Sequence, residues 1–235
     1  MSLVLVTGAS TGLGLATVDA LAAAGHDVVL HARSEDRLED ASVLDRVTAT
    51  AYADLADVAA TVDLAQRLDQ LGPFDAVIHN AGTMDRALAV PVNVVAPYVL
   101  TAAMRPVGRS IVLSSGMHLG GGTDLAHGGD YSDSKLWVTA LFLALAERRP
   151  GTSFHAVDPG WVPTRMGGRG APDDLVEGHR TQVWLATAAE SEIDPRAGGY
   201  WHHHSPRDPH RSAVDPAFQD RVISHLEDVT SLRLE

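Results

Sequence analysis

Short apolar segments alternate along the chain with longer segments in which apolar residues follow a helical period. The short segments are expected to be strands over residues 3–7, 27–31, 47–52, 74–79, 110–114 and 153–157, with a last strand near 200–202. The longer segments are expected to be helices over residues 15–25, 55–71, 92–104 and 131–147. Repeated strand–helix units predict an α/β fold, a doubly wound parallel sheet of about seven strands with helices on both faces.

The 235 residues are expected to form one domain, because no Ser/Pro-rich stretch or charge run divides the chain. The helices over 92–104 and 131–147 are apolar on nearly every side, which allows two interpretations. Either a second copy of the chain covers them, as in a homodimer or homotetramer, or both are buried inside the domain. Residues 205–235 follow no clear pattern and are interpreted as a C-terminal extension.

Charge and composition restrict the function. Eighteen basic and thirty acidic residues give a net charge of −12, which argues against a nucleic acid as partner. Cysteine is absent, which excludes a disulfide and a cysteine-based metal site. The chain begins without a signal-peptide pattern, and its most apolar stretch, residues 136–146, is too short to span a bilayer. A cytoplasmic protein without membrane contact is expected.

A glycine-rich turn follows the first predicted strand, with the spacing G-x3-G-x-G over residues 8–14. Glycine permits a tight turn and a close approach of backbone N–H groups, and the next helix adds the positive end of its dipole. The turn therefore predicts a pyrophosphate site, although an ordinary strand-to-helix turn is the alternative. The residues expected at the phosphates are Gly8, Ser10, Thr11, Gly12, Leu13 and Gly14.

The end of the second predicted strand indicates which dinucleotide is bound. An acidic residue there selects NAD, whereas an arginine accommodates the 2′-phosphate of NADP. This chain has Arg33 and Ser34 at that place and no carboxylate. Both side chains can bind a phosphate, so NADP(H) is preferred as cofactor, with NAD(H) as the second choice. The alternative is that Arg33 is only a solvated surface residue.

Tyr131 and Lys135 begin the long apolar helix and are four residues apart, so both side chains lie on one helix face. The ammonium of Lys135 is expected to favour the ionised phenol and so to lower the pKa of Tyr131. A phenol tuned in this way, close to a dinucleotide, indicates combined proton and hydride chemistry on a carbonyl or an alcohol.

With these residues assembled, the chain resembles the short-chain dehydrogenase/reductase family, in its compact single-domain branch with a Rossmann-type fold. The matching motifs occur in the family's order over residues 3–164. They are Thr7-Gly8-x3-Gly12-x-Gly14, Asp54-Leu55, Asn80-Ala81-Gly82, Asn93, Ser114-Ser115, Tyr131-x3-Lys135 and Pro159-Gly160 with Thr164. The segments Ser-Ser-x-x-His and Gly-Gly-Tyr-Trp resemble the subgroup related to retinol dehydrogenases and protochlorophyllide reductases.

The resemblance implies further cofactor contacts. They are Asp54 near the adenine with Leu55 beside it, Asn80, Ala81 and Gly82 at the strand end beside the ribose, and Val162 and Thr164 at the nicotinamide carboxamide, just after Pro159 and Gly160. Two of these assignments have structural alternatives. Asp54 is an equally good N-cap for the helix ahead of it, and residues 80–82 are also typical of a turn.

The resemblance also implies the residues of the reacting centre. Ser115 would bond the substrate oxygen beside Tyr131; it is preferred to Ser114 because the family uses the second serine and neighbouring strand residues face opposite ways. Asn93 would bind a water that links Lys135 to solvent. Pro97 is unfavourable inside a helix and predicts a local bend near that water. As alternatives, the serines and Asn93 cap secondary structure, and the Tyr–Lys pair lies on the surface by chance.

Two glycine-rich segments are expected to form the walls of the substrate site. Residues 116–130 contain six glycines and predict a mobile loop, and residues 161–180 are interpreted as the substrate loop. Trp161 either contacts the substrate or packs under its loop. No metal is expected, because the run of histidines at 202–204 alternates sides along a strand and lacks an acidic partner at ligand spacing. The more probable role of His118 is a loop hydrogen bond.

These observations predict an NADP(H)-dependent oxidoreductase that interconverts a small-molecule aldehyde or ketone with an alcohol. The alternative is a non-catalytic protein that senses NADP(H) and keeps only the phosphate turn. A sensor has no need of a proton donor, so the set of Asn93, Ser115, Tyr131 and Lys135 favours the enzyme. The sequence does not define the substrate, because loop shape determines specificity.

Overall fold

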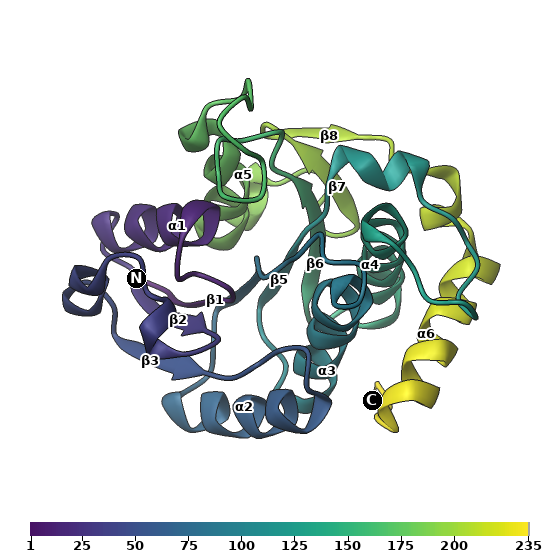
Figure 1. Cartoon of the computed structure of the whole chain (residues 1–235), viewed down its shortest axis with the longest axis horizontal. Coiled ribbons are helices and arrows are strands. Elements are labelled where there is room, and N and C mark those ends of the chain that lie inside the picture. Colours follow the sequence, from purple (N-terminus) through teal and green to yellow (C-terminus); the bar gives the residue numbers. More distant parts are fainter. Residues whose placement is uncertain (235) are drawn as a thin grey trace.

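Eight strands form one sheet in the computed structural model, which describes residues 1–234 (Figure 1). They are β1 Leu3–Val6, β2 Asp27–Ala32, β3 Ala49–Tyr52, β4 Ala76–His79, β5 Arg109–Leu113, β6 Ser153–Asp158, β7 Gly199–His202 and β8 Ser205–Arg207. Their order in the sheet is β3-β2-β1-β4-β5-β6-β7-β8. Strands β1 to β7 are parallel, which confirms the predicted sheet, and β8 adds an antiparallel edge strand that the sequence pattern did not predict.

Helices cover both faces of the sheet, as predicted for a doubly wound fold. The α-helices are α1 Gly12–Ala23, α2 Val58–Leu71, α3 Ala96–Ala103, α4 Tyr131–Arg148, α5 Leu175–Thr187 and α6 Pro216–Thr230. Helices α1 and α5 lie against each other on one face, and α2 and α3 do so on the other face beside α4 (Figure 1). Each face buries its own aliphatic cluster, so the sheet has apolar residues on both sides, as parallel sheets require.

The sheet order creates a switch point beside β1. Strand β1 pairs with β2 on one side and with β4 on the other. The helix that leads from β1 to β2, α1, and the helix that leads into β4, α2, therefore cover opposite faces of the sheet. The loops that follow β1 and β4 therefore meet at the carboxyl edge of the sheet, where doubly wound folds bind their ligands. The glycine turn over 8–14 and the segment 80–82 are those two loops.

Several predicted boundaries are wrong. The helix expected from residue 55 begins at Val58, because Asp57 rather than Asp54 accepts the N-cap bond, from Ala60. The helix expected over 92–104 begins with a π-helical turn, Pro91–Val95, before α3. The irregularity in this helix thus lies one turn before Pro97, and a bend at Pro97 itself stays a prediction.

The two C-terminal segments also contain more regular structure than predicted. Residues 161–174 are irregular, but the last part of the expected loop, from Leu175, is the start of α5. The predicted extension contains β8, a 3₁₀ turn over Arg211–Val214 called η6, and α6, while its last residue, Glu235, lies outside the described chain. Helix α6 was missed although its apolar residues face one side.

Helix α4 is buried within the chain itself. Its residues 134–145 are all buried, because α6 and η6 pack on the side that faces away from the sheet (Figure 1). The apolar surface expected to meet a second copy is thus covered by the chain's own C-terminal segment, and oligomerisation through α4 stays a prediction without this support. In residues 1–234, no helix has both the length and the apolar character needed to cross a bilayer.

Candidate active site

The phosphate turn is packed tightly against the loop that follows β4. The Asn80 side chain donates to the carbonyls of Thr7 and Gly8 at 2.9 and 3.1 Å, and the Ala81 N–H donates to Thr7 Oγ1 at 3.1 Å. A Cβ atom on Gly14 would lie 2.4 Å from Asn80 Nδ2 and 2.6 Å from the Gly8 carbonyl oxygen. Gly8 has φ +63°, which favours glycine. Asn80 and Ala81 are thus brought to the turn, where they hold its backbone.

Helix α1 presents an open N-terminus to this turn. Thr11 is the N-cap residue, but its side chain makes no capping bond, so the N–H groups of the first helical turn remain available to an anion. Ser10 lies beside it and is half-buried. These features fit the pyrophosphate of a dinucleotide, since the glycines leave the space and the helix supplies the donors.

His31, on β2, was missed by the sequence analysis and anchors the turn. The Gly8 N–H donates to His31 Nδ1 at 3.2 Å, so Nε2 carries the ring proton and donates to the Ala53 carbonyl at 3.1 Å. The side chain is buried, and this burial lowers the pKa of His31 to about 4. A neutral imidazole thus joins the phosphate turn to the end of β3, next to Asp54.

The residues expected at the adenosine end have different exposures. Arg33 is exposed directly after β2 and has no ion-pair partner in residues 1–234, while Ser34 is half-buried beside it. Asp54 is exposed and accepts the Ala56 N–H at 3.0 Å, which leaves one carboxylate oxygen free for a ligand. The side chain of Leu55 belongs to the core under α2, so only the backbone of this residue can contact a cofactor.

The segment after β6 crosses toward the phosphate turn. A Cβ atom on Gly12 would lie 3.3 Å from Thr164 Cγ2, so Thr164 stands against the turn. The buried Val162 packs on Gly178 of α5, which also faces Leu13. Pro159 and Gly160 form the bend that begins this crossing. The structure therefore brings together the predicted contacts from β1 and from β6, on opposite sides of one crevice.

The two serines after β5 point to different places. Ser114 is buried and bonds Thr139 of α4 at 2.7 Å. Ser115 is half-buried, its Oγ accepts the Met117 N–H at 3.2 Å, and its hydroxyl is close enough to Tyr131 to lower the pKa of that phenol. The preference for Ser115 over Ser114 therefore agrees with the geometry.

Lys135 is buried under Tyr131. Its Nζ donates to the Leu113 carbonyl at 2.6 Å and lies 5.6 Å from the centre of the Tyr131 ring. Gly82 passes close to the same ammonium, because a Cβ atom there would lie 3.5 Å from Nζ. Burial lowers the pKa of Lys135 to about 8, and Asp158 opposes this shift.

Asp158 is a second residue that the sequence analysis missed. It ends β6, pairs with His202 of β7, and accepts the Gly160 N–H at 3.1 Å. Its Oδ2 lies 3.5 Å from His202 Nδ1 and close to Gly116, directly after Ser115. Its position at the carboxyl edge, just before Pro159, is the signal that could have identified it.

The pKa of Tyr131 is shifted in the direction opposite to the one expected. Burial of the phenol raises its pKa, the hydrogen bond with Ser115 lowers it, and the negative charge of Asp158 raises it. The expected net lowering of this pKa is therefore wrong for the residues of this chain, because burial and Asp158 raise it; the Lys135 ammonium, 5.6 Å from the ring centre, still lies close enough to act on a phenolate. The phenol is kept protonated at neutral pH.

Asn93 lies in the π-helical turn and is buried. Its amide accepts the Thr83 N–H at 2.8 Å and donates to the Thr83 carbonyl at 3.0 Å and to Ser134 Oγ at 2.9 Å. The side chain therefore fastens the loop after β4 to α4. Pro97 has no N–H to offer to the Asn93 carbonyl, four residues earlier, and the water link between Asn93 and Lys135 stays a prediction.

Comparison with known proteins agrees with this arrangement. A family model described as "short chain dehydrogenase" matches residues 2–174. The chain belongs to the short-chain dehydrogenase family. It is accordingly an NAD(P)-dependent oxidoreductase. The match includes all the residues predicted for the cofactor and the reacting centre.

Named relatives cover the whole chain. The short-chain dehydrogenase chyC of Penicillium rubens is 34% identical over 100% of this chain and 99% of its own length, and chry4 of Gibberella zeae has the same identity and coverage. Among solved structures, an NADPH-bound carbonyl reductase from chicken fatty liver has a TM-score of 0.72 at 21% identity, covering 89% of this chain and 99% of its own. A short-chain dehydrogenase from Shigella flexneri in complex with NADP has a TM-score of 0.73 at 23% identity, covering 87% and 97%. These structures share the fold.

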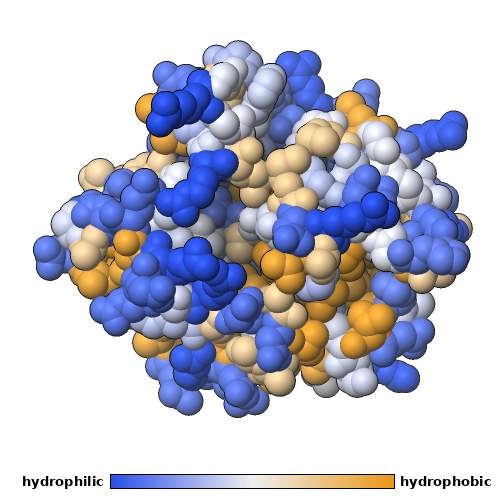
Figure 2. Space-filling view, in the orientation of Figure 1, coloured by the Kyte–Doolittle hydropathy of each residue, from blue (hydrophilic) through white to orange (hydrophobic). Residues whose placement is uncertain are grey.

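The two glycine-rich segments of this short-chain dehydrogenase carry exposed apolar side chains. Four large ones in the two glycine-rich segments are 45–59% exposed: Met117, Leu119, Trp161 and Met166. The Trp161 N–H donates to the Gly167 carbonyl at 2.7 Å, so the indole is fixed on the loop surface and is not packed beneath it. Figure 2 shows the hollow in this face, over the ends of the central strands of Figure 1.

The histidines at 202–204 lie at the end of β7 and in the turn to β8. His202 and His203 stack at 3.9 Å in the β7–β8 turn, and no group of three or more His, Asp or Glu residues within 1–234 could hold a metal ion. His118 has the expected loop bond, from Nδ1 to the Ser115 carbonyl at 2.8 Å.

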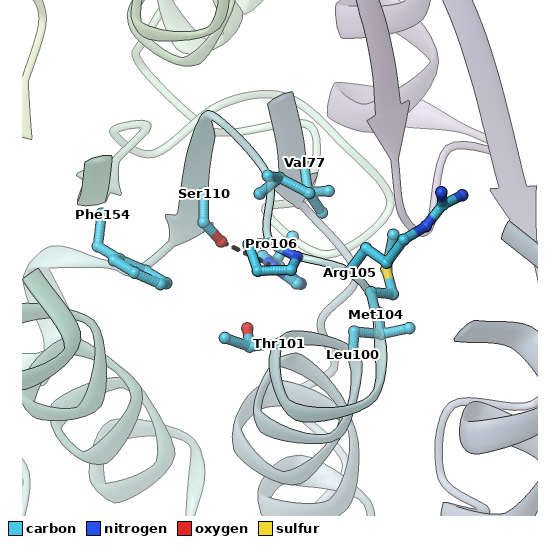
Figure 3. Close-up of a pocket in the computed structure, with 10 residues that line it drawn as sticks. Val77, Leu100, Thr101, Met104, Arg105, Pro106, Ser110 and Phe154 are labelled. Atoms are coloured by element: carbon cyan, nitrogen blue, oxygen red, sulfur yellow. Dashed lines mark hydrogen bonds between the residues drawn. The ribbon is translucent and has the colours of Figure 1, made fainter. Parts of the chain in front are cut away.

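A small cavity of about 20 Å³ lies under α3, toward the amino ends of β5 and β6 and away from the crevice (Figure 3). Thr101, Ser110 and Phe154 line it, and the dashed line from Ser110 is its 3.2 Å bond to His79. A cavity of this size has room for about one water. It is separate from the predicted site.

Proposed function

We propose that this protein reduces an aldehyde or ketone to an alcohol with NADPH, and that Tyr131 donates the proton. When bound, NADPH supplies the hydride. The oxygen of the carbonyl becomes negative as it is reduced, so it needs a proton donor and a hydrogen-bond donor in place beforehand. Tyr131 is the first of these and Ser115 the second. Lys135 stabilises the phenolate that remains.

One observation carries this proposal: the Tyr131 phenol lies over the buried ammonium of Lys135, 5.6 Å from the ring centre, at the carboxyl edge beside Ser115 and the phosphate turn. A phenol that starts a reduction must be protonated, and burial together with Asp158 raises the pKa of Tyr131 and so keeps it protonated. A protein that only sensed the dinucleotide would not need a buried ammonium under this phenol.

The proposed cofactor contacts follow from the crevice. Residues 8–14 with Asn80, Ala81 and Gly82 would hold the pyrophosphate and ribose, and residues 159–164 would face the nicotinamide. Arg33 supports NADPH over NADH, because its exposed guanidinium is free to pair with a 2′-phosphate and no acidic residue ends β2. A titration with NADH that gives equal or tighter binding would contradict this preference.

The exposed apolar residues of the two glycine-rich segments support an apolar carbonyl compound as substrate, since burying them on a ligand is favourable. We further propose that residues 1–235 work as a single dinucleotide-binding domain. A homodimer or homotetramer and the likeness to the retinol dehydrogenase subgroup stay predictions.

The proposal is tested with wild type and Tyr131→Phe on a panel of apolar aldehydes and ketones, following NADPH consumption. The variant is expected to lose about 10²- to 10⁴-fold in kcat, the usual contribution of a positioned acid. Its Kd for NADPH should change less than about twofold, because the ring that packs at the site is retained.

A matched control is Tyr98→Phe, which removes another buried phenol, bonded to the Leu232 carbonyl at 2.8 Å outside the crevice. It should lower stability and leave kcat unchanged. Wild-type kcat in Tyr131→Phe would show that Tyr131 is not the proton donor. Tight NADPH binding by a wild type that turns over no carbonyl compound would favour the sensor.

A further inference from the structure

His118 has no free ring nitrogen. It lies in a 3₁₀ turn, η4 Gly116–Gly120, and its side chain is completely buried. The His210 N–H donates to His118 Nε2 at 2.9 Å, and since a backbone N–H can only donate, Nε2 must be unprotonated. The ring proton is therefore on Nδ1, which donates to the Ser115 carbonyl at 2.8 Å. The imidazole is neutral and held in one tautomer.

The two bonds join distant parts of the chain. Ser115 lies between the central strand β5 and η4. His210 precedes η6 in the C-terminal segment, 92 residues after His118. The ring of His118 also packs on the Tyr200 ring of β7, with the centroids 4.6 Å apart. The His118 side chain is thus bonded to Ser115 through one ring nitrogen and to the C-terminal segment through the other.

The turn that holds Ser115 packs against α4, and the hydrogen bonds of Ser115 itself are local. Its Oγ accepts the Met117 N–H, and its carbonyl accepts the His118 N–H at 3.0 Å, both within the turn itself. The residues that follow the turn are fixed to α4, because the Gly122 N–H donates to Asp133 Oδ1 at 2.6 Å and the Gly122 carbonyl accepts the Trp137 N–H at 2.8 Å. The His118 ring adds a direct hydrogen-bonded link between this turn and the C-terminal segment.

We propose that His118 is a positioning residue, which couples the C-terminal segment 208–215 to Ser115 and so sets the place of its hydroxyl for carbonyl reduction. This inference rests on the proposed function, because it assigns a purpose to the position of Ser115. A displacement of the order of an ångström at a hydrogen-bonding group is enough to slow a reaction about 100-fold. The C-terminal segment is then part of the catalytic support.

Three substitutions of His118 separate its two bonds. Phenylalanine keeps the ring packing on Tyr200 but removes both bonds, asparagine can still donate to the Ser115 carbonyl, and glutamine can still accept from His210. His118→Phe is expected to lower kcat about 10- to 100-fold with an NADPH Kd within about twofold of wild type. His118→Asn should recover part of kcat. The matched control is His155→Gln, which alters another buried histidine with both nitrogens bonded, to Trp201 and Ser153.

A second pair of variants acts from the other end of the link. His210 has φ −54°, which proline adopts, so His210→Pro removes the N–H that bonds His118 without backbone strain at that φ. His210→Ala keeps the N–H and loses only the cap that the His210 side chain gives to Ser212. The difference in kcat between these two variants therefore reports the N–H. We expect His210→Pro to be slower than His210→Ala by about 10-fold at equal NADPH affinity.

The coupling is also measured without turnover, through the amide resonances of residues 115–117 in the full chain. They should shift in His210→Pro relative to His210→Ala, while those of residues 12–14 stay unchanged. If the wild type itself proved inactive, the proposed function would fail and these shifts would still decide the coupling. Unshifted resonances, wild-type kcat in His118→Phe, or an equal loss of kcat in His155→Gln would each overturn the positioning role.

Discussion

The phosphate turn and the reacting centre are each anchored by a buried histidine with both ring nitrogens bonded, yet the two histidines join very different parts of the chain. His31 connects Gly8 and Ala53, which are 23 and 22 residues away. His118 connects Ser115 with His210, 92 residues away. The histidine of the phosphate turn thus bonds only to the first strands and the loops beside them. The histidine of the reacting centre instead bonds to the C-terminal segment.

The two regions also differ in how much space they leave. A Cβ atom on Gly8 or Gly14 would collide with neighbouring backbone, so the turn has one conformation. A Cβ atom on Gly120 or Gly170, in the walls of the substrate crevice, would meet nothing within 4 Å. The walls of the substrate site thus contain open positions beside packed ones, such as Gly121 and Gly167, whose Cβ atoms would lie 2.6 and 2.1 Å from the Ser132 and Val162 carbonyl oxygens.

The largest effect is expected at the buried ammonium of the reacting centre. Lys135→Met should lower kcat about 10²- to 10³-fold, as loss of one charge-stabilising donor does. The same variant should be more stable at pH 7. In the folded protein the pKa of Lys135 is about 8, below its ordinary 10.5, so the unfolded chain binds more protons between these values and stability rises with pH across that window.

At pH 7 the buried charge is therefore unfavourable, and its removal should raise the free energy of unfolding by about 1–3 kcal/mol. Chemical denaturation at pH 7 measures this gain, and steady-state rates measure the loss. A variant that is both inactive and less stable would show that Lys135 supports the fold, which contradicts its assignment to the chemistry.

The next effect tests the close packing of the cofactor side. Gly14→Ala places a methyl group against Asn80 and the Gly8 carbonyl, so the turn must open. We expect the NADPH Kd to rise about 10- to 100-fold, with a loss of about 1–3 kcal/mol in stability, as for other overpacked sites. Gly170→Ala is the control in the open region and should change neither quantity. Equal behaviour of the two variants would abolish the contrast between the regions.

A smaller effect is expected from the histidine of the phosphate turn. His31→Gln leaves the Gly8 N–H or the Ala53 carbonyl without its partner, and the resulting disorder should raise the NADPH Kd about 10-fold. At saturating NADPH, kcat should remain that of wild type. This result is the converse of that expected for His118→Phe. If His31→Gln instead lowered kcat at saturation, the two regions would not be independent.

A separate effect, on stability and not on binding or rate, is a dependence on pH. Burial lowers the pKa of His31 from 6.5 to about 4, so the stability that its neutral form contributes is complete above pH 6.5 and is lost as pH falls toward 4. At pH 5 the loss from this group is about 2 kcal/mol. Denaturation curves at pH 7 and pH 5 measure this loss. Between these two pH values, the free energy of unfolding should fall by about 2 kcal/mol less in His31→Gln than in wild type. An identical pH dependence would mean that His31 is protonated in the folded state.

The sequence was informative wherever the signal is local. The strands and the phosphate turn could be predicted because hydrophobic period and glycine spacing depend on neighbouring residues. The choice of Ser115 over Ser114 followed from strand alternation and from the resemblance, and Tyr131 and Lys135 were brought to the same edge because their helix begins there.

What the sequence could not provide depends on distant contacts. Helix α6 packs on α4 and thereby buries the apolar residues that suggested a second copy. Asp158 changes the pKa of Tyr131 only because β6 lies next to β5, and Leu113 holds the Lys135 ammonium only after folding. A histidine in a strand, such as His31, has no local pattern that separates an anchor from an ordinary core residue.

The most direct test of the account is the transfer of deuterium from NADPH labelled at the reactive C4 position to an apolar ketone. Wild type, in single turnover, should give one deuterated alcohol for each cofactor oxidised. Tyr131→Phe, which still binds the labelled cofactor, should form it about 10²- to 10⁴-fold more slowly. A wild type that binds NADPH tightly and yields no deuterated alcohol from any carbonyl compound of the panel would contradict the account.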